Sequence, residues 1–495
     1  MPERIVTVPT GSIRGETAGG VSVFRGIPYA AAPVGGLRFR PPQAAEPWTG
    51  VRDATRFGPT APKGGYPEFA RPLLPEVDIP GQEYLNLNVW APSEEPPAAS
   101  AAPSAAPRPD GPWPVLVWIH GGSFTNGSGS VPEYDGSAFA RDGVVCVTIN
   151  YRLGAEGFLL LGDDVANLGL LDMVAALTWV RDNIAAFGGD PARVALAGES
   201  AGAMAIGPLL AMPAARGQFA GAILQSGAAA NAISAADAER VAAWLAADLG
   251  VPATRDGLAQ VPVDTLVAAG YRVAREVATH SEDWGRVALQ GLPLAPVIDG
   301  RTLPGAPLDH LIFDGPLLAG SNRDESRLFF LPSGALAQMD DVFLEASAHR
   351  FGLSPQGLAV YRQQSPDASP GDVFAAVDTD RRFRRPAIDL AEAAPRAWLY
   401  RFDGVPLAAN DGLGSCHTAE VPFVFGTTGL AAMRARLGPD PSPACADLVH
   451  RTWVEFVTRG EPGWPGYDTA TRTTALLGDR LEVVSDPQPE TRLAW

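Results

Sequence analysis

Lysine is almost absent from this sequence of 495 residues: Lys63, in the stretch APKGGY, is the only one. A G-K-S/T phosphate loop is therefore excluded, and a cofactor held as a lysine Schiff base is not expected. Basic residues as a whole are outnumbered, with 38 Lys and Arg against 55 Asp and Glu, which gives a formal net charge of −17. Such a charge repels nucleic-acid phosphates and anionic lipid headgroups, so we expect neither as a partner.

Cysteine is scarce as well. Cys146, Cys416 and Cys445 are too few and too scattered for a disulfide framework or a zinc site, so we expect reduced thiols and no metal. The most apolar long stretch, residues 201–215, contains two prolines and is too short to span a bilayer, which predicts a buried helix. No cationic segment followed by an apolar core opens the sequence, and we expect a cytoplasmic protein.

Short apolar runs, by contrast, are frequent, and helical patterns separate them. Runs that suit buried strands occupy residues 114–119, 144–149, 194–197, 221–226, 316–321 and 397–402. Between the second and third runs, apolar residues recur at helical spacing until Gly188 and Gly189 end the pattern. Strand, helix, strand in this order predicts an α/β fold with a large, mostly parallel central sheet flanked by helices.

No internal repeat or clear boundary divides the chain, so we expect one domain over residues 1–495. Two long helical excursions, at about 228–310 and 331–395, interrupt the strand pattern. Insertions of this size are expected to form caps over the carboxyl edge of the sheet, where α/β proteins bind ligands. Residues 93–112, rich in Pro, Ala and Ser, are expected to form a flexible loop.

Ser200 lies in the stretch FGGDPARVALAGESAGA, directly after the run at 194–197 and before an apolar helical pattern. A strand-to-helix elbow of the G-x-S-x-G type strains the backbone at the serine, and Gly198 and Gly202 remove the side chains that would clash there. This context favours a nucleophilic serine over an ordinary glycine-rich turn. Its hydroxyl needs a base, and the base needs a carboxylate, in the chain order serine, acid, histidine.

His417 is the candidate base because it lies in a glycine-punctuated loop after the run at 397–402. His349 and His450 occur within helical patterns, where surface or packing roles are the simpler account. The acid should follow an earlier strand, and both Asp324 and Glu325 do so. Spacing alone does not choose between them.

Attack on a carbonyl also needs hydrogen-bond donors for the developing oxyanion. Gly121 and Gly122, in WIHGGSF, follow a buried run, and their amides can approach a substrate together with the amide of Ala201. A tight Gly-Gly turn is the alternative. His120 is interpreted as a support for this loop rather than as a second base.

These residues resemble the type-B carboxylesterase family of α/β-hydrolases, which includes bacterial p-nitrobenzyl esterases and the cholinesterases. The elbow pattern of that family, F-G-G-x4-V-x-L-x-G-E-S-A-G, is filled at every position from Phe187 to Gly202. Further similarity lies in FRGIPYAAAPVGGLRFRPP, LNVWAP, HGGSF, NYRLGAEGF and PFVFG. The resemblance implies an α/β-hydrolase fold and a serine carboxylesterase without cofactor that acts on small-molecule esters.

The resemblance also implies site residues. It selects Glu325 as the acid of a triad with Ser200 and His417, and it gives Glu199 a tuning role beside the nucleophile. Two positions depart from the family: Tyr84 stands where secreted members have a disulfide cysteine, and Ser326 replaces the common glycine.

The substrate pocket is the least defined part. Phe124, Trp284, Phe329 and Phe330 are candidates for its lining, although aromatic residues more often belong to the core. An amidase or peptidase with the same triad and a non-catalytic binding homologue are the alternative functions. We expect a monomer.

Overall fold

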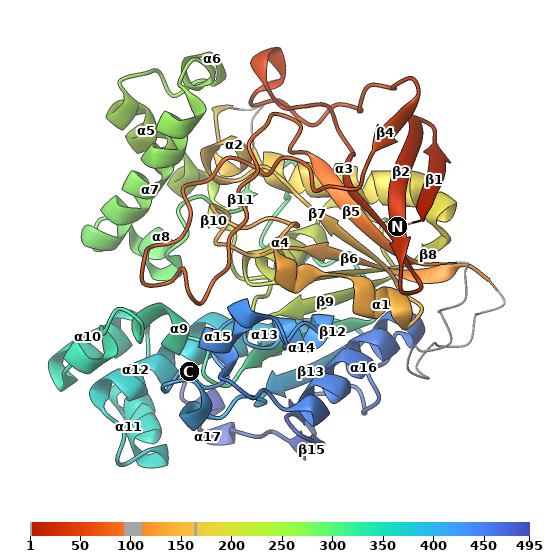
Figure 1. The fold of residues 1–495 in the computed structure, drawn as a ribbon. Helices are drawn as coiled ribbons and strands as arrows, with labels where there is room; N and C mark the ends of the chain where they lie inside the picture. Colours follow the sequence, from red (N-terminus) through yellow and green to blue (C-terminus); the bar gives the residue numbers. More distant parts are fainter. Residues whose placement is uncertain (1, 94–110, 163–165) are drawn as a thin grey trace.

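A computed structural model describes residues 2–93, 111–162 and 166–495 of the protein. Its centre is a 13-stranded sheet with the strand order β1-β2-β3-β5-β7-β6-β8-β9-β12-β13-β14-β15, and β4 pairs with β2 (Figure 1). The parallel strands are β7 (Val145–Ile149), β6 (Trp113–Ile119), β8 (Gly189–Glu199), β9 (Gly221–Gln225), β12 (Leu317–Asn322), β13 (Ala397–Phe402) and β14 (Thr473–Leu477). The six strands expected from the apolar runs all lie in this parallel part, so the predicted α/β sheet is confirmed.

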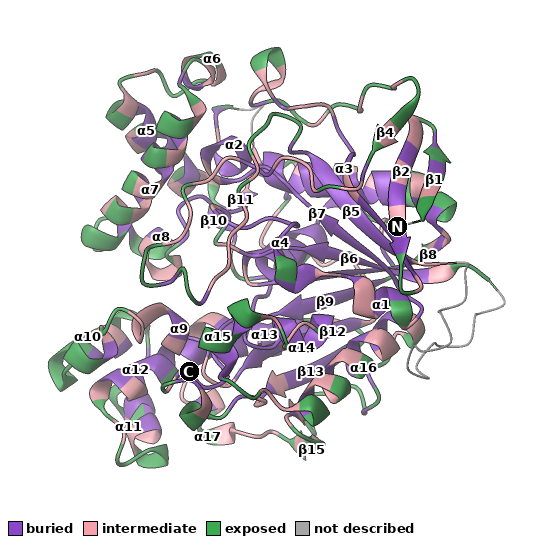
Figure 2. Ribbon diagram, in the orientation of Figure 1, coloured by how far each residue is buried: buried purple, intermediate pink, exposed green. Residues whose placement is uncertain are grey.

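Burial on both faces explains why these strands lack an alternating pattern. Along β6, Val115 and Val117 belong to one core cluster, whereas Leu116 and Trp118 belong to another on the opposite face. Figure 2 shows the same strands buried over most of their length.

The antiparallel edge of the sheet was not part of the sequence prediction. It consists of β1 (Glu3–Val8), β2 (Gly11–Ala18), β3 (Val21–Pro28) and β5 (Asn86–Pro92), with the short β4 (Val51–Asp53) beside β2. A hairpin partner, β15 (Leu481–Ser485), closes the other edge. The expected flexible loop at 93–112 falls mostly on residues 94–110, which lie outside the described residues.

Helices cover both faces of the sheet. The first core cluster packs α3 (Leu168–Asn183) and α4 (Ala201–Leu209) on one face, and the second packs α14 (Val421–Phe425) and α16 (Pro443–Arg459) on the other. The helix expected at 201–215 is buried and ends at Leu209, just after Pro208. Shorter helices are α1 (Ser137–Arg141), α2 (Gly154–Phe158), α9 (Arg327–Phe330), α15 (Arg434–Leu437) and α17 (Pro489–Leu493). Within the described ranges, no helix is both long and apolar enough to cross a membrane.

The two long excursions are helical, as the sequence patterns indicate. After β9 come α5 (Ala235–Leu249), α6 (Arg255–Ala259), α7 (Val263–Thr279) and α8 (Gly285–Gln290), with the small sheet of β10 (Ile233–Ser234) and β11 (Val297–Ile298). After β12 come α10 (Asp341–Arg350), α11 (Pro355–Gln364), α12 (Pro370–Thr379), a π-helical turn (Asp380–Arg384) and α13 (Arg385–Ala393). Figure 1 shows α5 to α8 (green) and α10 to α12 (cyan) on the same side of the molecule.

Candidate active site

Ser200 stands at the turn between β8 and α4. Its backbone angles, φ 54° and ψ −125°, are unfavourable for a residue with a side chain, and its amide donates to the carbonyl of Gln225 at 2.9 Å. A Cβ at Gly202 would lie 2.1 Å from the carbonyl oxygen of Ile119, and one at Gly198 would lie 2.8 Å from the backbone of Gly202. Both glycines are therefore required by the close packing of the elbow.

His417 and Glu325 come from loops after β13 and β12 and meet Ser200 in one hydrogen-bonded chain. The Nε2 atom of His417 lies 2.8 Å from Ser200 Oγ, and its Nδ1 atom lies 2.6 Å from Glu325 Oε2. The second oxygen of Glu325, which is fully buried, accepts the amide of Asn322 at 2.7 Å. Asp324 is turned away, because its carboxylate accepts the amide of Ser415 and pairs with Arg323.

The loop after β6 brings free amides next to the serine. Among the described residues, none accepts a hydrogen bond from the amides of Gly121, Gly122 or Ala201. A Cβ at Gly121 would lie 3.1 Å from the Cβ of Ser200, so the loop packs against the side chain of the serine. His120 Nδ1 lies 2.7 Å from the Gly121 carbonyl oxygen, and burial lowers the pKa of His120 to about 3, in keeping with a supporting role.

Two further buried carboxyl groups surround this chain of residues. Glu199 Oε1 lies 3.2 Å from His417 Nε2, and burial together with Glu420 and Glu325 raises the pKa of Glu199 well above its ordinary value. Glu420 accepts from Asn322 Nδ2 at 2.6 Å, and burial together with Glu325 raises its pKa to about 7. Sequence reasoning missed Glu420 and Asn322; the only available signal was their short distance in sequence from His417 and Glu325.

A cavity opens onto Ser200. It is lined by the two loop glycines, Ser123, Gly127, His417 and Thr418, together with Tyr66, Leu74, Pro75, Val131, Glu133, Tyr134, Glu199, Leu328 and Phe329. Of the four aromatic candidates, only Phe329 belongs to this lining, and its ring centroid is 5.0 Å from that of His417.

The other three aromatic candidates lie elsewhere. Phe124 is fully buried and packs on Phe158 at 4.7 Å, so it supports the loop from the core. Trp284 lies beneath the guanidinium of Arg240, and Phe330 packs on Phe374 in the separate core of α10 to α12. None of these three side chains is among the residues that line the cavity at Ser200, so the expectation that they line it is wrong.

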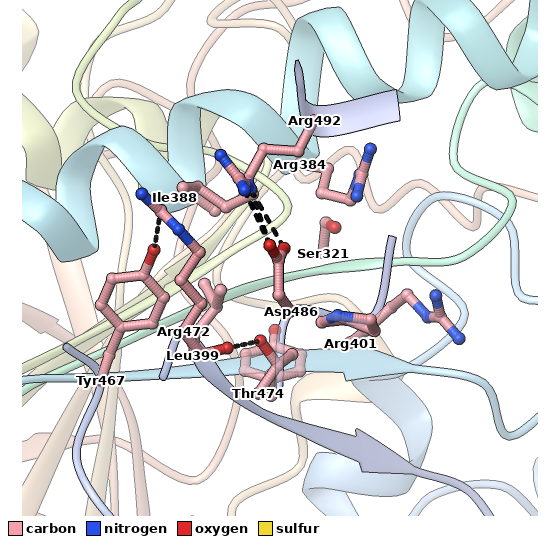
Figure 3. Close-up of a pocket in the computed structure, with 13 residues that line it drawn as sticks. Ser321, Arg384, Ile388, Leu399, Arg401, Tyr467, Arg472, Thr474, Asp486 and Arg492 are labelled. Atoms are coloured by element: carbon pink, nitrogen blue, oxygen red, sulfur yellow. Dashed lines mark hydrogen bonds and ion pairs between the residues drawn. The ribbon is translucent and has the colours of Figure 1, made fainter. Parts of the chain in front are cut away.

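A second cavity, between β13, α13 and the C-terminal segment, presents Arg384, Arg401, Arg472 and Arg492 (Figure 3). Each arginine pairs with a carboxylate, namely Asp380, Asp403, Glu392 and Asp486 respectively. The charges of these four arginines are thus balanced, which makes the cavity a poor site for an anionic ligand. Within the part of the chain that is described, no group of three His, Cys, Asp or Glu side chains could hold a metal ion.

Comparisons with known proteins find relatives that match nearly the whole chain. A sequence model of the carboxylesterase family matches residues 2–476. The para-nitrobenzyl esterase of Bacillus subtilis (strain 168) is 37% identical to this chain, and the alignment covers 99% of this chain and 98% of that protein. The phenmedipham hydrolase of Pseudarthrobacter oxydans is 36% identical, and the alignment covers 97% of each protein. Among solved structures, a carboxylesterase of Geobacillus stearothermophilus matches with a TM-score of 0.83 at 34% identity and covers 99% of both chains.

Proposed function

The chain belongs to the carboxylesterase family and is a carboxylic ester hydrolase, and we propose that Ser200, His417 and Glu325 carry out the hydrolysis. The observation that supports this assignment is the continuous hydrogen-bonded chain from Ser200 Oγ through the imidazole to a buried carboxylate. No other histidine of the described residues lies within hydrogen-bonding distance of that hydroxyl.

In the proposed cycle, His417 Nε2 takes the proton of Ser200 as Oγ attacks the ester carbonyl. The amides of Gly121, Gly122 and Ala201 donate to the oxyanion of the tetrahedral intermediate. His417 then protonates the leaving alcohol, and a water molecule attacks the acyl-enzyme by the same route. Glu325 accepts from Nδ1–H and so holds the imidazole in the tautomer that leaves Nε2 free.

Glu199 is proposed to tune this step rather than to react. Its carboxyl lies against the edge of the imidazole, where an ionised group would stabilise the imidazolium. Burial and the neighbouring glutamates favour its neutral form, so we propose that the carboxyl oxygen facing His417 acts on the imidazolium as a dipole and keeps its proton throughout the cycle.

The test is replacement of the nucleophile. Ser200→Ala is expected to lower kcat for p-nitrophenyl butyrate by at least about 10⁴-fold and to abolish fluorophosphonate labelling, with an unchanged melting temperature. Ser333→Ala, an exposed serine, is the matched control. A Ser200→Ala enzyme with wild-type turnover would refute the assignment, and a matched anilide hydrolysed as fast as the ester would point to an amidase.

We also propose finer features of the molecule. The two helical excursions form caps of a single domain. In support, the ring centroid of Phe383, from the second excursion, lies 4.9 Å from that of His417, and Tyr271, from the first, donates to Asn126 Oδ1 in the loop after β6. The three cysteines are free and buried, which supports a reducing, cytoplasmic location. Apart from the neighbours Val342 and Phe343, the exposed large apolar side chains of the described residues lie far apart in the sequence, which supports a monomer. Size-exclusion chromatography with light scattering tests this.

A further inference from the structure

The segment between β4 and β5 contains a closed loop over the cavity at Ser200. Residues 60–79, here called the cover loop, begin and end at a backbone hydrogen bond of 2.9 Å from the amide of Thr60 to the carbonyl of Ile79. Tyr66, Leu74 and Pro75 of this loop line the cavity. The segment passes beside α7 in Figure 1, and a Cβ at Gly64 would lie 2.5 Å from the ring of Tyr271.

A buried ion pair lies inside the cover loop. Lys63, the only lysine of the chain, is 1% exposed, and its Nζ atom donates to Thr60 Oγ1 at 2.9 Å. Its charged partners are Glu76, whose side chain is 17% exposed and whose Oε1 atom lies 3.8 Å from Nζ, and the exposed Asp78, whose Oδ1 atom lies 3.9 Å away. Burial lowers the pKa of Lys63 and raises that of Glu76, while each one's charge opposes these shifts in the other. A pair taken out of water in this way is costly unless each member has further partners.

Glu76 has such a partner in the loop that carries the oxyanion amides. Its Oε2 atom accepts the amide of Gly127 at 3.0 Å. Gly127 in turn lies directly on that loop, since a Cβ there would lie 2.3 Å from the Gly121 carbonyl oxygen and 2.6 Å from His120 Nδ1. The contact therefore joins the cover loop to the backbone that presents Gly121.

Tyr271 of α7 makes a second connection from the same side. Its hydroxyl donates to Asn126 Oδ1 at 2.7 Å and accepts the amide of Gly64 at 3.2 Å. The Asn126 amide donates to the Gly122 carbonyl at 2.8 Å. Asn126 and Gly127, which contact the two oxyanion glycines, are thus hydrogen-bonded to the first helical excursion and to the cover loop, respectively.

We propose that Glu76, held in place by Lys63, is a positioning residue that fixes the amides of Gly121 and Gly122 for the oxyanion. This inference rests on the proposed function for its catalytic consequence. Oxyanion donors act only within a few tenths of an ångström of their best position, and a displacement of about 1 Å in an active site lowers the rate about 100-fold. Substrate binding in the ground state needs no such precision, so the effect belongs to kcat rather than to KM.

The test compares two substitutions at one position. Glu76→Leu removes the acceptor at similar size, and we expect kcat to fall about 10- to 100-fold with KM within about threefold of wild type. The inhibition constant of an aryl trifluoromethyl ketone, which forms an oxyanion on the serine, should rise in parallel with the loss of kcat/KM. Glu76→Gln keeps a carbonyl acceptor for Gly127 and is expected to retain kcat within about threefold. Glu68→Gln, at an exposed position of the same loop, is the control.

Hydrogen exchange provides a readout that does not depend on activity. Peptides covering residues 119–129 should exchange faster in Glu76→Leu than in wild type and in Glu76→Gln. A wild-type enzyme without esterase turnover would contradict the proposed function, and the exchange data would still decide the support that Glu76 gives to the loop. Unchanged exchange in these peptides, or an unchanged kcat in Glu76→Leu, would overturn the inference.

Should Glu76→Leu fail to fold, Lys63→Met removes the cation that holds Glu76 and leaves the carboxylate at position 76 in place. It is expected to raise exchange in the same peptides and to lower kcat several-fold, and wild-type values of both would overturn the inference. Amine acylation mapped to Lys63 gives a further signal, because this residue carries the only side-chain amine. Its labelling should be slow in wild type and faster in Glu76→Leu.

Discussion

Replacing Gly122 by alanine should damage catalysis far more than it damages the fold. The backbone at Gly122 has φ +115°, and a Cβ there would lie 2.2 Å from the Asn126 carbonyl oxygen and 2.5 Å from its carbon. Ordinary contact needs about 3.5 Å. The Asn126 backbone would therefore have to move by about 1 Å, and it is bonded to the Gly122 carbonyl through its own amide.

A shift of that size takes one or both glycine amides out of reach of the oxyanion. Loss of a single donor costs about 3 kcal/mol of transition-state stabilisation, so turnover should slow by roughly two to three orders of magnitude. The strained backbone at this position adds roughly 1 to 3 kcal/mol of lost stability. Most of the molecule is unaffected, so we expect a folded protein with a lower melting temperature and little turnover.

The assay is the turnover of p-nitrophenyl butyrate, measured on enzyme whose folding is checked by circular dichroism and thermal melting. Gly429→Ala is the matched control, because a Cβ at Gly429 meets nothing within 4 Å. A folded Gly122→Ala enzyme with kcat within about threefold of wild type would refute the assignment of this loop to the oxyanion.

Three further outcomes are expected. Phe329→Ala should enlarge the cavity at Ser200 and raise kcat/KM for long-chain relative to short-chain p-nitrophenyl esters. Phe330→Ala should leave this ratio unchanged, because Phe330 packs on Phe374 instead. Equal ratios in the two variants would contradict the expectation. The pKa of Glu420 is raised to about 7, so the folded state holds the Glu420 proton more tightly than the unfolded chain does. The protonated carboxyl therefore contributes its full stabilisation below about pH 4.5, and this contribution is lost as the pH rises through about 7. The unfolding free energy of wild type relative to Glu420→Gln should accordingly fall by up to about 3 kcal/mol between pH 4.5 and 8, and a constant difference would refute it. Burial raises the pKa of all three cysteine thiols, which makes them unreactive in the folded protein. Ellman's reagent should therefore label no thiol of the native protein within minutes and all three thiols in guanidinium. A native thiol that reacts fast would show that at least one of them is not buried.

Sequence reasoning reached furthest where the signal is local. The elbow at Ser200 could be recognised because a buried strand, two glycines and an apolar helix must follow one another in the chain. His417 could be singled out because the other two histidines that follow the candidate acid strand, His349 and His450, occur in helical patterns, and the structure puts them in α10 and α16.

Side-chain neighbours were harder to infer. Asp324 and Glu325 follow the same strand, and only the path of the loop decides that Glu325 faces the imidazole while Asp324 faces Ser415. Aromatic identity did not distinguish Phe329, which reaches the cavity, from Phe330, which packs in another core.

By itself, the sequence determined the parallel sheet, the strand-to-helix elbow at Ser200 and the lack of a G-K-S/T phosphate loop, because each depends on residue type and on spacing within a few turns or strands. Only the tertiary structure decided that Glu420 accepts a hydrogen bond from Asn322, next to Glu325, and that Glu76 accepts one from the amide of Gly127. A single carboxylate has no pattern of its own in a chain with 55 acidic residues. Its role comes from groups 51 to 98 residues away that the fold brings within about 3 Å.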